Sequence, residues 1–273
     1  MTLAISRRCL PALLATAVAL AGAPAFGQTA APAKPFEPTV GQAGKDVVWV
    51  PTPQPLVEKM LDLAKITPQD LHYDLGSGDG RTVITAARRG ARSFGIEYNP
   101  DMVELSRRNA AAAKVSPDRA TFVQADLFET DFSKANVVTL FLLPSINMKL
   151  RPKILEMAPG TRIVANTFTM EDWQADQTET ITGDCVSWCT ALLWIVPAKV
   201  EGTWQIGDET LTLTQKFQML EGTLGGRAIT DARMTGRDIA FTVGGGARYT
   251  GRVDGSTMTG TISSGGSFTG TRK

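Results

Sequence analysis

The stretch LHYDLGSGDGR, from Leu71 to Arg81, joins a short apolar run that ends in an acidic residue to a loop with three glycines in five positions. The apolar run predicts a strand, and the residues after the loop, TVITAARRG, predict a helix that ends near Gly90. Glycine has no Cβ, so the backbone at Gly76, Gly78 and Gly80 can approach a bound molecule closely. The stretch therefore predicts a strand, a loop that cradles a ligand, and a helix.

The spacing of the glycines and the charge around them indicate the kind of ligand. Dinucleotide-binding loops have the spacing GxGxxG and place a pyrophosphate at the helix N-terminus, whereas this loop has GxGxG and two acidic residues, Asp74 and Asp79. Two carboxylates repel a phosphate and favour a ligand with positive charge. S-adenosylmethionine has a sulfonium and an amino group, and its amino-acid end can also bind to the amides of the loop.

The next two predicted strands also end in acidic residues. Glu97 ends RSFGIE, where a carboxylate can accept hydrogen bonds from both hydroxyls of a ribose, and Asp126 with Leu127 ends the strand after it. At that position an acid can bind an adenine amino group and a leucine can cover the ring. An acidic residue after a strand is ordinarily a solvated strand end, and a glycine loop is often only a turn, but the three features in this order fit one nucleoside.

From about Val47 to Pro197 the sequence alternates short apolar runs with helical patterns, which is typical of an α/β fold with a parallel sheet. A second predicted helix follows Tyr98, with Asn99 as its cap and Pro100 at its first position. The predicted strands comprise residues 71–75, 92–98, 120–126, 136–143, 161–168 and 190–197.

Residues 201–273 are rich in glycine and threonine and contain short alternating segments, TLTLTQ and IAFTV among them, which predict a meander of antiparallel strands. A large apolar residue followed by Thr-Gly recurs in this part of the chain, at Met234, Tyr249, Met258 and Phe268. We interpret each repeat as a strand that presents its large residue to a shared core, with glycine at a bend or bulge. The expected result is a small antiparallel barrel or curled sheet.

The N-terminal residues have the pattern of an export signal. Arg7 and Arg8 precede an uncharged apolar run of about 17 residues, from Leu10 to Phe26, which ends in small residues. A buried helix and a membrane anchor are the alternatives, but the run is at the short limit for spanning a bilayer. SRRCL resembles the twin-arginine export motif, and its cysteine precedes the apolar run, so no lipoprotein is expected. We therefore expect a signal peptide over residues 1–27, a flexible linker over 28–44, and a periplasmic protein without a transmembrane segment.

Export would leave a nearly neutral chain. Removal of residues 1–27 takes away two arginines and no acid, which leaves 26 basic and 27 acidic residues. Non-specific nucleic-acid binding depends on a strong positive field, so no nucleic-acid partner is expected. Cys185 and Cys189, in CVSWC, can form a disulfide in an oxidising compartment or remain two free thiols. CxxxC without a nearby histidine is a poor metal site, so no metal is expected.

From Val47 to Pro197 the sequence resembles the class I S-adenosylmethionine-dependent methyltransferases, and within them it is most similar to bacterial relatives of the mitochondrial protein-lysine methyltransferases. The glycine loop is shared across that superfamily, whereas the first and last of the matching motifs are narrower signals. The motifs that carry the resemblance are VPTP (50–53), YDLGSGDGR (73–81), GIEYNP (95–100), ADLF (125–128) and LLPSINMKLRP (142–152).

The resemblance implies a Rossmann-like, seven-stranded methyltransferase sheet in residues 45–198. The sequence departs from that family in two features, the expected signal peptide in front and the tail behind, which its own pattern predicts to be an antiparallel β-rich domain in residues 199–273. The resemblance also implies that Thr52 lines the cofactor pocket and that Leu143 and Pro144 border the transferred methyl group. The candidate residues for binding S-adenosylmethionine are Thr52, Asp74, Gly76, Ser77, Gly78, Asp79, Gly80, Glu97, Tyr98, Asp126, Leu127, Leu143 and Pro144.

The resemblance implies transfer of a methyl group, with a protein lysine or another envelope molecule as the acceptor. Such a displacement needs no covalent enzyme intermediate, but a lysine must first lose its proton. Asn147 and Asp172 are candidate catalytic groups, with Trp173 beside them, and His72 is expected to be an ordinary strand residue. The alternative is an exported, non-catalytic protein that binds a nucleoside and attaches to an envelope partner through its β-rich tail.

Overall fold

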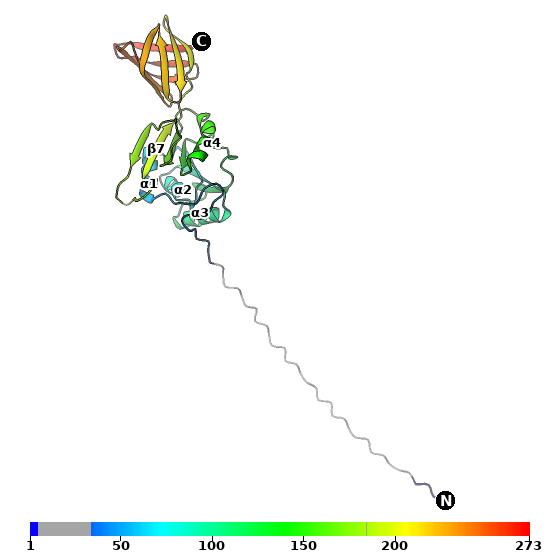
Figure 1. The fold of residues 1–273 in the computed structure, drawn as a ribbon. Coiled ribbons are helices and arrows are strands. Elements are labelled where there is room, and N and C mark those ends of the chain that lie inside the picture. Colours follow the sequence, from blue (N-terminus) through cyan, green and yellow to red (C-terminus); the bar gives the residue numbers. More distant parts are fainter. Residues whose placement is uncertain (5–33, 184) are drawn as a thin grey trace. The chain divides into compact units, whose positions relative to one another are not determined.

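The structure is a computed structural model that describes residues 1–4, 34–183 and 185–273. Residues 36–273 form one compact unit with an α/β region and a β-barrel (Figure 1). The expected signal peptide falls, after its first four residues, outside the described part of the chain. Within the described residues, no helix is long and apolar enough to cross a membrane.

The α/β region is built on a seven-stranded sheet with the order β3-β2-β1-β4-β5-β7-β6, which confirms the Rossmann-like fold class. β1 to β5 are parallel, whereas β7 is antiparallel to both β5 and β6. The sequence predicted that the last strand would also be parallel. A parallel return needs a long crossover, usually a helix, and the described residues between β5 and β7 form no helix and one further strand, β6. The strands are β1 (Leu71–Leu75), β2 (Arg92–Glu97), β3 (Ala120–Gln124), β4 (Val137–Leu140), β5 (Arg162–Asn166), β6 (Gln177–Thr180) and β7 (Thr190–Ile195).

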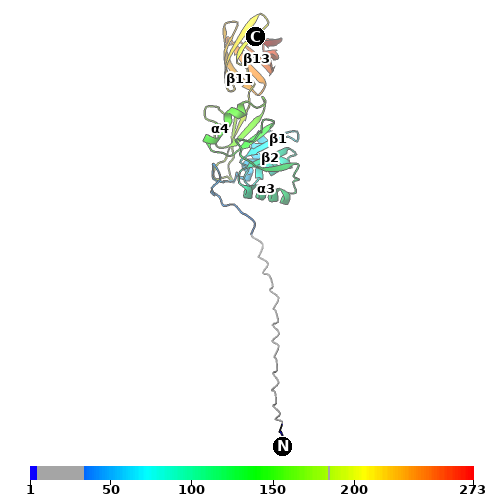
Figure 2. The same ribbon diagram turned by 90° about the vertical axis from the view of Figure 1, so that its right-hand side faces the viewer.

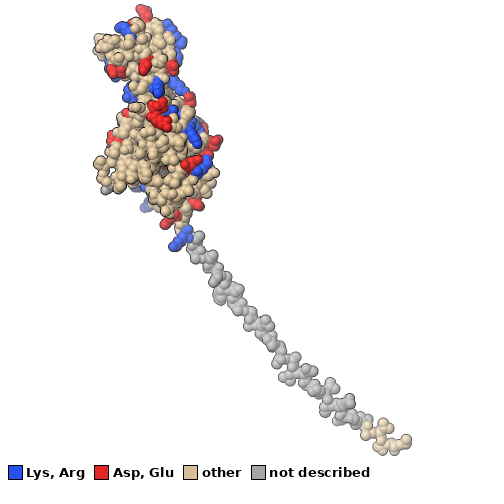
Figure 3. All heavy atoms as spheres, viewed as in Figure 1, with Lys and Arg blue, Asp and Glu red and all other residues tan. Residues whose placement is uncertain are grey.

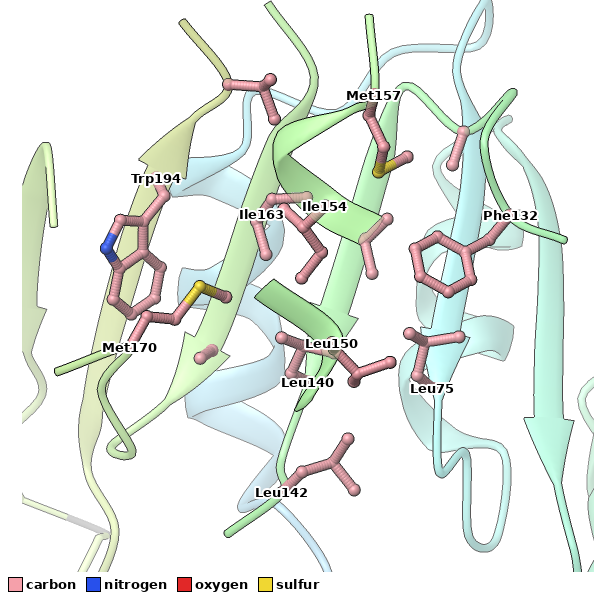
Figure 4. Close-up of a cluster of buried hydrophobic side chains, with 14 of the residues drawn as sticks. Leu75, Phe132, Leu140, Leu142, Leu150, Ile154, Met157, Ile163, Met170 and Trp194 are labelled. Atoms are coloured by element: carbon pink, nitrogen blue, oxygen red, sulfur yellow. The ribbon is translucent and has the colours of Figure 1, made fainter. Parts of the chain in front are cut away.

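Helices cover both faces of this sheet. α1 packs on one face against β4, β5 and β7, and α2 shares a hydrophobic cluster with α3 and β3. α4 covers the opposite face, where Leu150 and Ile154 pack in one cluster with Leu140 and Ile163 (Figure 4). The helices are α1 (Gln54–Leu63), α2 (Arg81–Arg88), α3 (Pro100–Ala112) and α4 (Pro144–Leu155).

The sequence patterns set no bounds for α1, α4 or β6. α4 begins at Pro144, whose fixed φ suits the first turn of a helix, but Pro152 also lies inside it. A proline inside a helix removes a hydrogen bond and is unusual, so this segment lacks the ordinary helical pattern. The strand predicted to reach Leu143 ends at Leu140 instead, because Leu143 is already the N-terminal cap of α4.

The tail forms a closed antiparallel barrel, in which each strand pairs with the next and β15 pairs back with β8 (Figure 2). The prediction of a barrel or curled sheet is thus confirmed in its closed form. Large side chains fill the interior, Trp204, Phe241 and Tyr249 among them, so the barrel is a packed core. The strands are β8 (Gly202–Ile206), β9 (Glu209–Lys216), β10 (Met219–Leu224), β11 (Arg227–Thr235), β12 (Asp238–Val243), β13 (Ala247–Asp254), β14 (Thr257–Ile262) and β15 (Ser267–Arg272).

The sequence repeats of the tail place their large residues in the barrel core, as predicted. Their glycines differ from the prediction. Gly236 lies in a turn with a φ of +59°, but Gly251 and Gly260 lie within strands, where a Cβ would come 2.9 and 2.7 Å from ring atoms of Phe268. The same Cβ atoms would come closer still to the backbone carbonyl oxygens of Thr259 and Thr250, so these two glycines allow the close approach of both the neighbouring strand and Phe268.

Candidate functional site

A pocket lies at the carboxyl ends of β1, β2 and β4, the edge at which ligands bind in open α/β sheets. Its volume is about 1060 Å³, with the open mouth included. The walls come from the glycine loop, from the ends of these strands, and from residues 42–52, which we call the strap. The first part of the strap belongs to the segment that the sequence suggested as a flexible linker.

The glycine loop adopts a backbone that other residues rarely can. The φ angles of Gly76, Gly78 and Gly80 are +78°, +54° and +82°, all in the left-handed region. A Cβ on Gly78 would lie 2.7 Å from the indole nitrogen of Trp49 in the strap. Gly80 instead caps α2, and a Cβ there would come 2.7 Å from the ring of Phe122. Gly78 thus lets the strap close on the loop, whereas Gly80 serves packing behind it.

Asp74 lies in the pocket wall at the end of a buried hydrogen-bond chain. Its Oδ1 accepts a hydrogen bond from the Thr139 hydroxyl at 2.6 Å. The Thr139 oxygen lies 2.8 Å from His72 Nε2, and the other ring nitrogen lies 2.6 Å from the Ser93 hydroxyl. This chain crosses β2, β1 and β4 and fixes the orientation of the Asp74 carboxylate.

Burial favours the neutral forms of Asp74 and His72, the two titratable groups in this series of hydrogen bonds. Burial, with smaller contributions from the nearby carboxylates of Asp79 and Glu97, raises the pKa of Asp74 to about 7. Burial lowers the pKa of His72 to about 3. A cation beside Asp74 would favour its charged form, so the site is suited to a positively charged ligand.

Asp79 contributes less negative charge to the pocket than the sequence suggested. Its carboxylate accepts hydrogen bonds from Arg81 Nε at 3.0 and 3.1 Å and from Arg81 Nη2 at 2.6 Å. Arg81 Nη1 also donates to the carbonyl oxygen of Thr52 at 2.9 Å. The pair therefore ties the end of the strap to the glycine loop, whereas neither Asp74 nor Glu97 has an ion-pair partner among the described residues.

Glu97 is held in place by backbone amides on both sides. Its Oε2 accepts a hydrogen bond from the Gly78 amide at 3.0 Å, and its Oε1 accepts one from the Asn99 amide at 2.9 Å. A carboxylate offers about four lone-pair sites, so capacity remains for the two hydroxyls of a ribose. Glu97 is thus oriented in advance for the role that the sequence predicts.

Asp126 forms an ion pair that the sequence did not predict. Its Oδ2 accepts from Lys45 of the strap, and its Oδ1 accepts from the Phe128 amide at 2.8 Å. The Lys45 ammonium also lies 4.9 Å from the centre of the Tyr98 ring. The hydrogen bond between the two side chains lowers the pKa of Asp126 and raises that of Lys45. Lys45 therefore links the strap to the ends of β2 and β3 across the mouth of the pocket.

The strap as a whole is the part of the site that sequence patterns missed. It folds back on itself through reciprocal backbone hydrogen bonds of 2.9 Å that join Trp49 to Gly41 and Gln42. Lys45 and Trp49 then touch residues more than 25 positions away, and no local periodicity records such contacts. The VPTP motif, residues 50–53, was the one sequence feature that linked the end of this segment to the cofactor pocket.

The structure brings most of the predicted cofactor residues together. Gly80, Leu143 and Pro144 are not among the residues that line the pocket, and the end of β4 contributes Phe141 and Leu142 instead. The predicted residues that do line it are Thr52, Asp74, Gly76, Ser77, Gly78, Asp79, Glu97, Tyr98, Asp126 and Leu127.

The suggested catalytic groups lie elsewhere. Asn147 is fully buried and donates to the carbonyl oxygens of Phe168 and Thr169 at 3.2 and 3.3 Å. Asp172 is ion-paired with Arg151 at 2.5 Å, and neighbouring Trp173 is part of the core. None of the three suggested residues lines the pocket, so a catalytic role for them stays a prediction.

The residues of the pocket fit S-adenosylmethionine. The Ser77 hydroxyl is buried in the wall without a hydrogen-bond partner among the described residues, Glu97 retains acceptor capacity, and Asp74 lacks a cation. On the face shown in Figure 3, acidic and basic side chains are interspersed, without the single-sign field of a nucleic-acid surface.

Known proteins resemble this part of the chain. The family model of the ANTKMT methyltransferase domain matches residues 74–177. A protein-lysine N-methyltransferase of Saccharolobus islandicus (strain REY15A) is 42% identical over 130 residues, which cover 46% of this chain and 80% of that protein. The adenine nucleotide translocase lysine N-methyltransferase of Mus musculus is 36% identical over 120 residues, which cover 43% of this chain and 52% of that protein. The chain thus spans about half the length of the mouse relative.

A solved structure shares the fold of the same region. The crystal structure of an RNA methyltransferase from Salinibacter ruber in complex with S-adenosyl-L-homocysteine is 50% identical, with a TM-score of 0.52. The match covers 55% of this chain and 96% of that one, so the barrel has no counterpart in it.

Proposed function

We propose, because this chain belongs to the class I S-adenosylmethionine-dependent methyltransferases related to the protein-lysine N-methyltransferases, that its acceptor is a lysine side chain of a cell-envelope protein. S-adenosylmethionine is the cofactor of the reaction. The observation that carries the acceptor proposal is the 42% identity to a protein-lysine N-methyltransferase over most of that relative's length. The non-catalytic alternative receives no support from these relatives.

The pocket residues have separate parts in holding the cofactor. Asp74 would pair with the cationic amino group, Glu97 would accept the ribose hydroxyls, and Leu127 would cover the adenine ring. The strap would close over the bound molecule, held by Lys45 on Asp126. When bound, S-adenosylmethionine supplies an electrophilic methyl group on its sulfonium, and the protein's task is to hold an acceptor nitrogen in line with it.

An acceptor lysine must be neutral when it reacts. Phe141 and Leu142, directly after β4, and Ile146 of α4 form an apolar part of the pocket wall, and such surroundings lower the pKa of an amine. His72 cannot take the proton, because it is fully buried and both ring nitrogens already have partners. We infer that the proton leaves through the open mouth of the pocket to water.

An RNA acceptor is less well supported, although the Salinibacter ruber relative is described as an RNA methyltransferase. After loss of residues 1–27 the chain would carry 26 basic and 27 acidic residues. Proteins that bind RNA backbones depend on an excess of positive charge. This chain lacks that excess, which favours a protein acceptor.

A methyl-transfer assay tests the acceptor. The purified protein is incubated with S-adenosylmethionine that carries a tritiated methyl group, in one reaction with envelope proteins and in another with total RNA. We expect label in protein and methylated lysine by mass spectrometry of the labelled band, with Glu97→Ala as the inactive control. Label found only in RNA would indicate a nucleic-acid acceptor and contradict the lysine acceptor. No label in either fraction would contradict the proposed methyl transfer to an envelope protein.

We also propose that the protein is exported to the periplasm, with the twin-arginine pathway as the route. The disulfide between Cys185 and Cys189 supports an oxidising compartment. Fractionation of cells that express a C-terminally tagged chain should place it in the periplasm, with its N-terminus near residue 28. A cytosolic protein that retains residues 1–27 would contradict export.

A further inference from the structure

Three aromatic rings form a continuous group at the end of β4. Phe141 lines the pocket directly after β4, Phe168 follows β5, and Trp188 lies in the connection between β6 and β7. The ring centres of Phe141 and Phe168 are 5.9 Å apart with an angle of 19° between planes. Those of Phe141 and Trp188 are 6.1 Å apart at 61°. Phe141 therefore connects the pocket wall to a side chain that is 43% exposed, Trp188. We call the three rings the aromatic wall.

The inner part of the aromatic wall is fixed by buried polar contacts. Asn147 is fully buried and donates to the carbonyl oxygen of Phe168 at 3.2 Å. Thr167, directly before Phe168, has a φ of +59°, which is unusual for a β-branched residue. Asn147 thus acts as a positioning residue for the Phe168 turn, which explains its burial without a contact to the pocket.

The outer part is fixed by a covalent bond. Trp188 lies between the disulfide-bonded Cys185 and Cys189. Its φ is +56°, in a region that non-glycine residues seldom adopt. Strained backbone of this kind persists where the surroundings enforce it, and it occurs often at functional sites. The short disulfide ring supplies that constraint and holds the indole against Phe141.

The chemistry of the aromatic wall suits an alkyl ammonium group. The face of an aromatic ring attracts a cation, most strongly for tryptophan. Among the described residues, the contacts between a lysine or arginine and a ring involve other rings, Tyr98, Phe128 and Trp204 among them. Phe141, the ring of the aromatic wall that lines the pocket, is followed by Leu142 in the same apolar pocket wall, which suits the methylene chain of a lysine.

We infer that the aromatic wall is the acceptor site, in which Trp188, held by the Cys185–Cys189 disulfide, receives the lysine ammonium group before its proton is lost. This inference rests on the proposed function. Trp188 is then a specificity-determining residue of the reaction, and the disulfide and Asn147 are positioning elements. The disulfide is not present in the matched family segment, residues 74–177, so the site is assigned from this chain's own loop.

Binding of a lysine analogue tests the site without any turnover. The purified protein, with its disulfide intact and with S-adenosylhomocysteine added, is labelled with 5-fluorotryptophan, which gives a fluorine resonance for each of its five tryptophans. Trp188→Phe identifies the resonance of Trp188. Nα-acetyl-lysine methylamide is then titrated, with its neutral Nε-acetylated form as the control.

We expect the charged analogue to shift the Trp188 resonance and the neutral one to shift it at least about fivefold less at the same concentration. Equal shifts with both analogues, or no shift at Trp188 at saturating millimolar concentration, would overturn the inference. Trp173, Trp194 and Trp204, which are fully buried in the cores of the sheet and the barrel, report any general change of the fold.

Kinetics separates this inference from the proposed function. In the labelling assay, Trp188→Leu should lower kcat/KM for the protein acceptor about five- to thirtyfold, whereas Trp188→Phe should keep most of it. Val186→Ala, in the same loop and 97% exposed, is the matched control and should match the wild type. S-adenosylmethionine affinity by calorimetry should stay within about twofold in all variants. A wild type that binds cofactor but labels no protein refutes the proposed function, while a fully active Trp188→Leu refutes only the acceptor site.

Discussion

Asp74 and His72 both form a hydrogen bond with the Thr139 hydroxyl, and their titrations change the stability of the fold with pH in opposite directions. The folded pKa of His72 is about 3 against 6.5 when exposed, so the unfolded chain binds the extra proton between these values and stability falls as the pH drops. The folded pKa of Asp74 is about 7 against 3.8, so the folded chain binds the extra proton and stability falls as the pH rises. Between about pH 4 and 6.5 the two groups change the free energy of unfolding with pH by equal and opposite amounts, so their combined effect on its pH dependence cancels.

Asp74→Asn should remove the contribution of Asp74 to the pH dependence of stability and leave that of His72. The amide can still accept the hydrogen bond from Thr139, but only the His72 contribution remains. We expect the free energy of unfolding of the variant, measured by urea at pH 4 to 7, to fall on acidification by up to about 1.4 kcal/mol per pH unit relative to the wild type. A difference from the wild type that stays constant with pH would contradict the pKa values on which this expectation depends.

Glu97→Ala should weaken the binding of S-adenosylmethionine. The variant loses a carboxylate that orients Gly78 and that would accept both ribose hydroxyls. Hydrogen bonds to charged groups contribute about 1.5 to 3 kcal/mol, so calorimetry should show at least a roughly tenfold higher Kd. Glu104→Ala, which removes an exposed acid of α3, is the control. An unchanged Kd for Glu97→Ala would place the ribose elsewhere.

The positions in the site of the residues that follow strands could be predicted from the sequence, whereas those of the residues in the strap could not. The carboxyl ends of adjacent parallel strands meet at one edge, so Asp74 and Glu97 could be brought together from the order of strands alone. The partner of Asp126 could not, because Lys45 lies 81 positions away, directly after the predicted linker. Arg81, by contrast, is only two positions from Asp79, and its ion pair reduces the negative charge that the acidic residues of the loop indicated for the pocket.

At the scale of elements, the strands of the sheet were predictable from their apolar runs, and their direction was not. β7 carries the same apolar pattern as the parallel strands, since both faces of each are covered. Its direction depends on the absence of a crossover helix, and β6, fully exposed, has no apolar pattern to reveal the hairpin. α4 was obscured by its internal proline.

The disulfide loop permits a prediction at this scale. Replacement of both Cys185 and Cys189 by serine frees the loop, so Trp188 loses its enforced backbone conformation. We expect kcat/KM for the protein acceptor to fall about as far as in Trp188→Leu, with the Kd for S-adenosylmethionine unchanged. The thermal midpoint of the α/β region should move little, because a loop this short constrains the unfolded chain least. Full activity of the double variant would show that the loop needs no covalent support.

At the scale of the whole molecule, the barrel and the α/β region share an ion pair in which the acid is buried and the arginine is partly exposed. Asp176, which precedes β6, has a side chain only 5% exposed, and it accepts from Arg233 of β11 at 2.5 Å and from the Ile195 amide at 2.7 Å. Burial raises the pKa of Asp176, and its two partners oppose that shift. Nearby, Phe217 of the barrel stacks on Trp173 with ring centres 5.7 Å apart. The two regions therefore stabilise each other.

Arg233→Met should show how strongly the regions depend on this pair. The change leaves Asp176 buried without its cation, and we expect a loss of about 1 to 3 kcal/mol in urea unfolding. Arg237→Met is the matched control, because its partner Asp254 is 86% exposed and such surface pairs contribute about 0 to 1 kcal/mol. Equal losses in both variants would mean that Asp176 finds another partner.

Because the barrel closes through the pairing of β15 with β8, its closure comes late in the synthesis and folding of the protein. β15 pairs with β8, so the ring joins the first strand of the barrel to its last, with Gly270 opposite Ile206. Such distant pairing is slow to form, and here the strand that completes the ring is also the last of the eight to be synthesised. Until it arrives, β8 and β14 each present an open edge to any neighbouring chain. The nascent protein is therefore most prone to aggregate just before synthesis of the barrel ends.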